Sequence, residues 1–266
     1  MKKQRLDLLL VARDLVEDNA LAQRFIRAGE VLVNGQLVDQ PGTPVPTDAD
    51  ITLKAKSRFV SRGGEKLAAA LERFPVAIMG KVAADIGAST GGFTDCLLQH
   101  GAVKVYAVDV GYGQLAWELR KDARVVALER VNARYLVALP EPVDVIVSDV
   151  SFISLRIVYA TAVRWLKPGG VVISLIKPQF EAGREQIGKG GVVRDPAVHR
   201  QVLETVTANL AELGLGLRGL MVSPLRGPAG NVEFLGWWVL GAEAGKVQAW
   251  IGQTLSDVGT FEHLNV

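Results

Sequence analysis

The sequence predicts an α/β protein in which a mostly parallel sheet with one antiparallel edge strand is preceded by a small α+β domain. Three observations lead to this prediction. Apolar strands alternate with helices from residue 81 onwards, the last two strands are joined by a short connection, and the first fifty-odd residues follow a different pattern. Alternating strands and helices are typical of a parallel sheet that is covered by helices on both faces.

The first domain, residues 1–56, should begin with two short helices. Apolar residues recur at helical spacing over 6–15 and again over 21–26. Glu17-Asp18-Asn19 lies between the two stretches, and its side chains can cap the second helix. Gly29 then ends that helix, because glycine readily adopts the left-handed conformation found after helix ends.

A hairpin is expected after these helices. Strands at 31–33 and 36–38 flank Asn34-Gly35, a dipeptide that tolerates the positive φ angles of a type I′ turn. A proline-rich loop leads to a further short strand at 50–53, and the polar residues that follow are typical of a linker. We therefore place the domain boundary near residue 56.

The second domain is expected over residues 63–245, after a linker at 57–62 and before a C-terminal extension at 246–266. The short connection at 224–230 allows the last two strands to pair antiparallel. Strands are predicted at 82–86, 105–108, 125–128, 143–148, 171–176, 217–222 and 232–240. Helices are predicted at 92–99, 114–119, 153–166 and 196–213.

The composition excludes several classes of protein. Of the 266 residues 49% are hydrophobic and 22% charged, so the chain can build a core and is not disordered. The net charge is only +2, so any surface for nucleic acid must come from local clustering of cations. The single cysteine, Cys96, cannot form an internal disulfide, and no uncharged run approaches the roughly 18 residues that span a bilayer. These features favour a cytoplasmic protein, and the three histidines lack the spacing of a metal site.

A glycine-rich turn joins the first long strand to its helix, and it reads Asp85-Ile86-Gly87-Ala88-Ser89-Thr90-Gly91-Gly92-Phe93. Glycines at such a turn let a ligand approach the backbone closely. Ser89 stands where a dinucleotide-binding turn requires glycine, and the lysine of a P-loop is absent. Asp109 ends the next strand, where a carboxylate can accept both hydroxyls of a ribose. Together these residues favour S-adenosylmethionine, although a tight turn with a capping aspartate explains the same pattern.

Four charged residues lie in positions that suggest chemistry. Asp149 follows an apolar strand at the edge where open α/β sheets build their sites, although it could equally cap a helix. Lys177 ends another apolar strand, which is an unusual place for a solvated lysine. Glu233 lies within an apolar run and Lys66 on a helix, and each alone would be interpreted as a surface charge.

Five motifs, in order and over nearly the whole chain, resemble those of the TlyA proteins, haemolysin-named enzymes similar to FtsJ-type ribose 2′-O-methyltransferases. They are Arg62-Gly63-Gly64-Glu65-Lys66-Leu67, the Asp85 to Phe93 turn, Ser148-Asp149-Val150-Ser151-Phe152-Ile153-Ser154-Leu155, Ile176-Lys177-Pro178-Gln179-Phe180-Glu181 and Gly230-Asn231-Val232-Glu233-Phe234. The N-terminal domain similarly resembles the small S4 RNA-binding domain.

The resemblance implies a Rossmann-like methyltransferase sheet and a Lys-Asp-Lys-Glu catalytic tetrad at Lys66, Asp149, Lys177 and Glu233. It also implies that S-adenosylmethionine lies on the glycine-rich turn and on Asp109. Asn132 follows the third strand, where methyltransferases commonly contact the adenine, although a plain loop residue would fit there too. The implied cofactor set is Asp85, Gly87, Ala88, Ser89, Thr90, Gly91, Gly92, Phe93, Asp109 and Asn132.

The N-terminal domain departs from the S4 pattern at one point. Asp18-Asn19 stands where that domain usually carries Ser-Arg at the start of its second helix, which puts the grip of this helix on phosphate in doubt. A solvated helix surface explains the basic residues as well as RNA binding does, and the resemblance favours RNA. The expected RNA-binding residues are Lys2, Lys3, Arg5, Arg13, Arg24 and Arg27.

We therefore expect an enzyme that methylates a ribose 2′-hydroxyl of ribosomal RNA, with RNA or ribosomal subunits as its partner. A 2′-hydroxyl is a weak nucleophile, so a base must remove its proton. Lys177 can be that base only in its neutral form, which partial burial and the like charge of Lys66 would favour. Asp149 and Glu233 would orient Lys177 and hold the ribose.

Three alternatives remain open at this point. A nicotinamide-dependent oxidoreductase would share the architecture, but Ser89 interrupts its characteristic turn. An RNA-binding protein without catalysis would fail to bind S-adenosylmethionine. A membrane-active haemolysin would need an amphipathic or spanning segment, and the sequence offers none.

Overall fold

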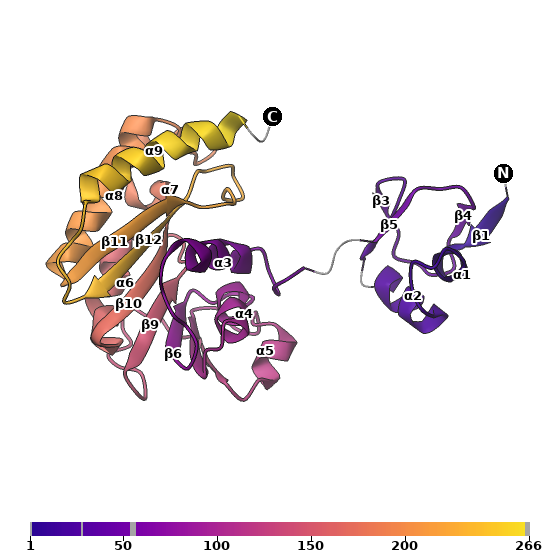
Figure 1. The fold of residues 1–266 in the computed structure, drawn as a ribbon, viewed down its shortest axis with the longest axis horizontal. Coiled ribbons are helices and arrows are strands. Elements are labelled where there is room, and N and C mark those ends of the chain that lie inside the picture. The colour runs from indigo at the N-terminus through magenta and orange to yellow at the C-terminus, as the bar shows by residue number, and fades with distance from the viewer. Residues whose placement is uncertain (1, 28, 54–56, 264–266) are drawn as a thin grey trace. The chain divides into compact units, whose positions relative to one another are not determined.

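The computed structural model describes residues 2–27, 29–53 and 57–263, which form two compact units, Met1–Ser57 and Arg58–Val266 (Figure 1). Residues 54–56, at the end of the expected first domain, lie outside the described residues. Each unit has its own hydrophobic core. We describe the two units separately.

In the first unit, helices α1 (Leu6–Ala12) and α2 (Asn19–Arg27) pack against each other. Asp18 caps α2, because its Oδ1 accepts the Leu21 N–H at 2.7 Å. Asn34 and Gly35 have φ angles of 49° and 77°, so the predicted type I′ turn is confirmed. The three-stranded antiparallel sheet has the order β3 (Gln36–Leu37), β2 (Val31–Val33) and β5 (Ile51–Leu53).

The proline-rich segment contains a strand that the sequence did not predict. Strand β4 (Pro44–Pro46) pairs antiparallel with β1 (Lys3–Arg5) in a separate two-stranded sheet. Proline cannot donate a ladder hydrogen bond and is therefore confined to edge positions, which a two-stranded sheet provides. The loop expected there is wrong for these three residues.

The second unit is built on a seven-stranded sheet, which confirms the predicted fold class. In spatial order the strands are β11 (Leu215–Val222), β12 (Phe234–Leu240), β10 (Leu166–Ile176), β9 (Val143–Ser148), β6 (Val82–Ile86), β7 (Lys104–Asp109) and β8 (Val125–Glu129). Strands β6 to β10 pair in parallel, whereas β12 runs antiparallel to both β10 and β11, so the antiparallel pairing is confined to one side. Because β12 is reversed, it begins at the edge where the parallel strands end.

Helices cover both faces of this sheet (Figure 1). Residues of α3 (Gly63–Arg73), α4 (Gly92–Gln99) and α5 (Trp117–Lys121) share one core with the sheet. The other core contains residues of α6 (Leu155–Ala162), α8 (Pro196–Glu212) and α9 (Val247–His263). The remaining helical segments are η1 (Val163–Trp165), α7 (Pro178–Glu181) and η2 (Arg184–Gln186).

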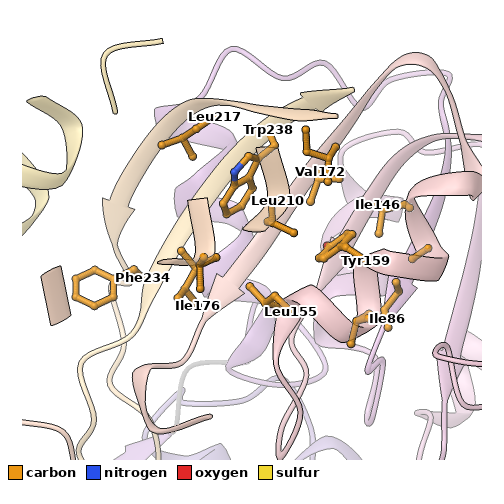
Figure 2. Packing of buried hydrophobic residues seen from close by; sticks show 14 of the residues in the cluster. Ile86, Ile146, Leu155, Tyr159, Val172, Ile176, Leu210, Leu217, Phe234 and Trp238 are labelled. Atoms are coloured by element: carbon orange, nitrogen blue, oxygen red, sulfur yellow. The ribbon is translucent and has the colours of Figure 1, made fainter. Parts of the chain in front are cut away.

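The second of these cores combines aromatic and aliphatic side chains. Figure 2 shows Tyr159 of α6 and Leu210 of α8 lying among side chains from several strands. Trp238 of β12 is fully buried in this core, whereas Trp237 belongs to the opposite face and lies against Phe74, with ring centroids 5.8 Å apart. The two tryptophans therefore follow the alternation of a strand.

Two segments expected outside the second domain contribute to its core. Phe59, within the expected linker 57–62, is only 2% exposed and packs so closely against Gly64 that a side chain there would overlap its ring. Helix α9 covers most of the expected C-terminal extension, and its Ile251 is fully buried. Residues 264–266 lie outside the described residues. Neither contribution could be predicted from the local sequence, because each depends on contacts with distant elements.

Candidate active site

The glycine-rich loop between β6 and α4 lies at the carboxyl edge of the sheet, against the segment that carries Asp149. Gly87 has a φ of 80°, and a Cβ at this position would lie 2.7 Å from the Asp149 carbonyl oxygen. Asp149 in turn donates its N–H to the Ile86 carbonyl. Only glycine fits between these two segments, so Gly87 allows the loop and Asp149 to pack together.

A cavity of about 530 Å³ opens beside this loop. Asp109 is held at its wall, because its carboxylate accepts the N–H groups of Ser89 at 2.8 Å and Gly111 at 2.6 Å. Each carboxylate oxygen still has a lone pair for a ligand. Asn132 also lines the cavity and accepts the Arg134 N–H at 3.0 Å. Apolar lining comes from Val108, Val131, Ala133, Ile153 and Val158.

Asp85 and Gly91, two members of the expected cofactor set, lie behind the loop. Asp85 is fully buried, and its Oδ2 accepts the Thr94 hydroxyl at 2.7 Å. Burial raises the pKa of Asp85 to about 7. Gly91 faces Leu115 and Leu119, whose side chains a Cβ would strike. Neither residue lines this cavity or the second cavity that adjoins it, so we expect both to shape the loop.

A second cavity, of about 410 Å³, adjoins the first and shares Gly87, Ser89, Asp149 and Ser151 with it. Its lining also includes the loop residues Ala88, Thr90, Gly92 and Phe93. The structure brings all four members of the expected tetrad to this cavity, although they come from four separate elements. Lys66 lies on α3, and the other three lie beside strand ends: Asp149 after β9, Lys177 after β10 and Glu233 before β12.

The tetrad forms two ion pairs. Lys66 Nζ lies 2.6 Å from Glu233 Oε2, with the two side chains 11% and 1% exposed. Lys177 Nζ lies 2.6 Å from Asp149 Oδ1, with side chains 12% and 23% exposed. Lys177 also donates to Ser151 Oγ at 2.9 Å. The second pair is therefore the one more accessible to a substrate in the cavity.

The charge of this second cavity, the candidate catalytic cavity, suits an anionic substrate. Arg62 and Arg226 line it in addition to the two lysines, so four cations face two carboxylates. Sequence reasoning named the motif that contains Arg62 but assigned a role only to Lys66. Among the described residues, no cluster of three or more His, Cys, Asp or Glu could hold a metal ion.

Two residues beside Asp149 were missed by sequence reasoning. Ser151 lines both cavities and contacts Lys177. Phe152 lines the larger cavity, is 90% exposed and has a φ of 63°, a conformation that bulky residues rarely adopt. Its ring lies 4.8 Å from that of Phe180, centroid to centroid. Both residues fall within a recognised motif, but nothing in a phenylalanine signals a positive φ.

In the first unit, most of the expected RNA-binding residues lie on the surface, and one makes contacts inside the unit. Lys2, Lys3, Arg5, Arg24 and Arg27 are exposed. Arg13 is half-buried and donates to the carbonyl oxygens of Thr47 and Ala49, so it joins the end of α1 to a distant turn. Its role inside the unit was not expected from the sequence.

A chain of hydrogen bonds connects two of the exposed arginines. Arg5 pairs with the buried Asp7 at 2.7 Å, and Gln23 donates to the same carboxylate at 3.2 Å. Arg27 in turn donates to Gln23 at 3.3 Å. Arg5 and Arg27 are therefore neighbours on one surface of this unit, where both could contact a polyanion.

The parallel sheet with its glycine-rich loop, nucleoside-sized cavity and adjoining charged cavity defines a methyltransferase of the Rossmann-like class. Residues 59–239 match the FtsJ-like methyltransferase family and residues 4–51 match the S4 domain. The chain belongs to the FtsJ-like methyltransferase family and carries an S4 domain at its N-terminus. The predicted family is thus confirmed, and its methyl donor is S-adenosylmethionine.

Related proteins cover nearly the whole chain. Over 240 residues it is 45% identical to a Mycobacterium tuberculosis protein named 16S/23S rRNA (cytidine-2′-O)-methyltransferase TlyA, covering 89% of this chain and 90% of that protein. YqxC of Bacillus subtilis is 50% identical over 241 residues, which cover 88% and 85% of the two chains. A solved structure of a hemolysin-named protein from Streptococcus thermophilus superposes with a TM-score of 0.76 at 42% identity, covering 100% and 98%.

Proposed function

We propose that this protein transfers the methyl group of S-adenosylmethionine to a ribose 2′-hydroxyl of ribosomal RNA in the cytoplasm. One observation carries the proposal. Two lysine–carboxylate pairs face a positively charged cavity, which adjoins the cavity that Asp109 and the glycine-rich loop border. Two reactants held in adjoining cavities would be positioned for direct transfer. The names of the relatives support ribosomal RNA as the substrate class.

The larger cavity fits the methyl donor. Gly87 leaves room where a side chain would collide with Asp149, and Asp109 offers acceptors for ribose hydroxyls next to an apolar wall. Asn132 offers an amide to the adenine. When bound, S-adenosylmethionine supplies an activated methyl group on a sulfonium, which is already a good leaving group.

Within the catalytic cavity we assign the proton transfer to Lys177. A neutral lysine amine can accept the 2′-hydroxyl proton, and Asp149 and Ser151 hold this amine in place through contacts of 2.6 and 2.9 Å. Lys66 and Glu233 form the deeper wall of the cavity, where their paired charges keep Lys66 beside the reacting groups. The cations Arg62 and Arg226 would attract the RNA backbone.

We assign the S4 unit, residues 1–56, to RNA positioning and residues 63–245, with their flanking segments, to chemistry. Phosphate contacts fix the register of a protein on nucleic acid without reading the bases. Replacing exposed Arg24 and Arg27 by glutamine should therefore weaken RNA binding and flatten its salt dependence, because fewer counterions are released. Filter binding at several salt concentrations measures this slope. An unchanged slope would remove these arginines from the RNA surface.

The decisive experiment is to incubate the purified protein and S-adenosylmethionine with ribosomal RNA and with ribosomal subunits, and to map 2′-O-methyl groups by mass spectrometry. We expect a new 2′-O-methyl group with the parent protein and none with a Lys177→Ala control. Methylation on a base, or no methylation of RNA or subunits, would contradict the proposal.

The hemolysin names among the relatives raise membrane activity as a second candidate. None of the described helices is long and apolar enough to cross a membrane. Leakage of dye from lipid vesicles by the parent and by Lys177→Ala to the same extent would support this second activity. An absence of leakage with either protein would remove it.

A further inference from the structure

Glu181 is a half-buried carboxylate that none of the roles above uses. It is the last residue of α7, and its Oε2 accepts the Ser154 hydroxyl at 2.7 Å while its Oε1 accepts the Leu155 N–H at 2.8 Å. Burial raises the pKa of its carboxyl, in opposition to these two hydrogen bonds. Both partners lie at the start of α6, where helix N–H groups attract a carboxylate.

These contacts join the two segments that carry Asp149 and Lys177. On one side, α7 is a single turn that begins directly after Lys177, and the Phe180 N–H donates to the Lys177 carbonyl at 2.9 Å. On the other side, the segment 149–154 connects β9 to α6 and carries Asp149 and Ser151. Glu181 therefore holds the far end of each segment in a fixed position relative to the other.

Two further contacts join the same segments nearer to the cavity. One is the pairing of Lys177 with Asp149 and Ser151, and the other is the contact between the rings of Phe152 and Phe180. The first involves the amine that takes up and releases the proton, and the second involves a highly exposed ring. The Glu181 contacts are half-buried and involve neither of these groups.

We propose that Glu181 is a positioning residue, which bonds α7 to the start of α6 and thereby keeps Lys177 Nζ beside Asp149 and Ser151. This inference rests on the proposed role of Lys177 and adds a residue that acts through it. A carboxylate at this point serves two donors at once, which alanine cannot do. Glutamine can keep both contacts, because its oxygen accepts the Leu155 N–H and its amide group donates to Ser154 Oγ.

The first test separates turnover from binding. In Glu181→Ala we expect kcat for RNA methylation at saturating substrates to fall at least tenfold, with the Kd for S-adenosylmethionine within threefold of the parent value. Glu181→Gln should keep kcat within threefold. As a matched control, Asp195→Ala removes a carboxylate that caps α8 through the Ala197 N–H at 2.8 Å and should leave kcat unchanged.

The second test needs no RNA activity and so separates this inference from the proposed function. Trace labelling with acetic anhydride, read by mass spectrometry, reports how accessible and reactive each lysine is. Relative to Lys104, labelling of Lys177 should rise at least threefold in Glu181→Ala and remain at the parent level in Glu181→Gln and Asp195→Ala. Parent-like labelling in Glu181→Ala, an equal rise in Glu181→Gln, or an equal loss of kcat in Asp195→Ala would overturn the inference.

Discussion

The two ion pairs of the catalytic cavity have the same 2.6 Å separation but lie in different environments. Lys66 and Glu233 are almost completely enclosed, whereas the carboxylate of the Lys177–Asp149 pair retains 23% exposure and its lysine has a hydroxyl partner. Two buried charges stay paired because neither can contact water or another charged group instead. A pair at the cavity surface can exchange its partner for a substrate. Equal distances thus accompany different surroundings, and we expect the two pairs to have different roles.

The largest effect should follow from changing the more exposed pair. Lys177→Arg keeps the charge, but a guanidinium cannot release its proton at working pH, so it cannot act as the base. We expect both Lys177→Arg and Lys177→Ala to lower the single-turnover methylation rate by about 10²- to 10⁴-fold while S-adenosylmethionine still binds. Rapid-quench kinetics measures the rate.

Lys167→Arg is the matched control, because Lys167 pairs with Asp144 outside the catalytic cavity. Its rate should equal that of the parent. Near-parent activity in Lys177→Arg would show that Lys177 acts only as a cation and would remove the distinction between the two pairs.

Changing the enclosed pair should lower stability as well as activity. Removing either partner leaves the other charge buried, so Lys66→Ala and Glu233→Ala should each lower the free energy of unfolding by about 3 to 5 kcal/mol. The double variant Lys66→Met, Glu233→Leu should recover most of this stability yet remain inactive. Urea unfolding and the methylation assay measure the two effects.

Arg58 and Glu72 form a surface ion pair with a separation of 3.8 Å, and this pair is the control for the stability prediction. Glu72→Gln should change the stability by less than about 1 kcal/mol. A loss of similar size in Glu72→Gln and Glu233→Ala would mean that burial does not distinguish these pairs.

Asp85 can be compared with the two ion pairs, because it is a buried carboxyl with no cation among its described hydrogen-bond partners. Its pKa is raised by burial to about 7, so its contribution to stability is present at low pH and is lost as pH rises toward 7. Between about pH 5 and pH 8 the stability of the parent relative to Asp85→Asn should fall by about 3 kcal/mol. Urea unfolding across this range measures it, and a difference independent of pH would contradict the prediction.

The smallest of the four effects concerns Asp109, a carboxylate held by backbone N–H groups in place of a cation. Asp109→Ala should weaken S-adenosylmethionine binding by about 1.5 to 3 kcal/mol, the usual value of hydrogen bonds to a charged group. Isothermal titration calorimetry measures the affinity, with Asp144→Ala, at the opposite edge of the sheet, as control. Unchanged affinity would place the ribose elsewhere.

Most of the sheet could be predicted from the sequence because its signals are local. Apolar runs define the strands, and the carboxyl ends of parallel strands necessarily meet at one edge. Asp149 and Lys177 could therefore be expected to lie together from their positions alone. Lys66 and Glu233 could not, since one lies on a helix and the other precedes a reversed strand, and only the family resemblance connected them.

The remaining features depend on distant contacts. Gly91 was expected to make room for a ligand, but the space at its Cβ position is filled by leucines from the α5 region. Arg13 was expected to face RNA, but two carbonyl groups more than thirty residues away take its donors. In each case the contacts of the residue are determined by tertiary structure, which the local sequence does not show.

The burial of Phe59 determines at which residue a fragment that contains the catalytic unit without the S4 unit should begin. Phe59 shares a core with Leu67 and Phe93, and the neighbouring Val60 N–H donates to Asp95 on α4 at 2.9 Å. A fragment that starts at residue 63 would lack this aromatic and expose apolar surface at the base of α3. A fragment that starts at residue 57 keeps the core closed and is the natural starting point for producing the catalytic unit alone.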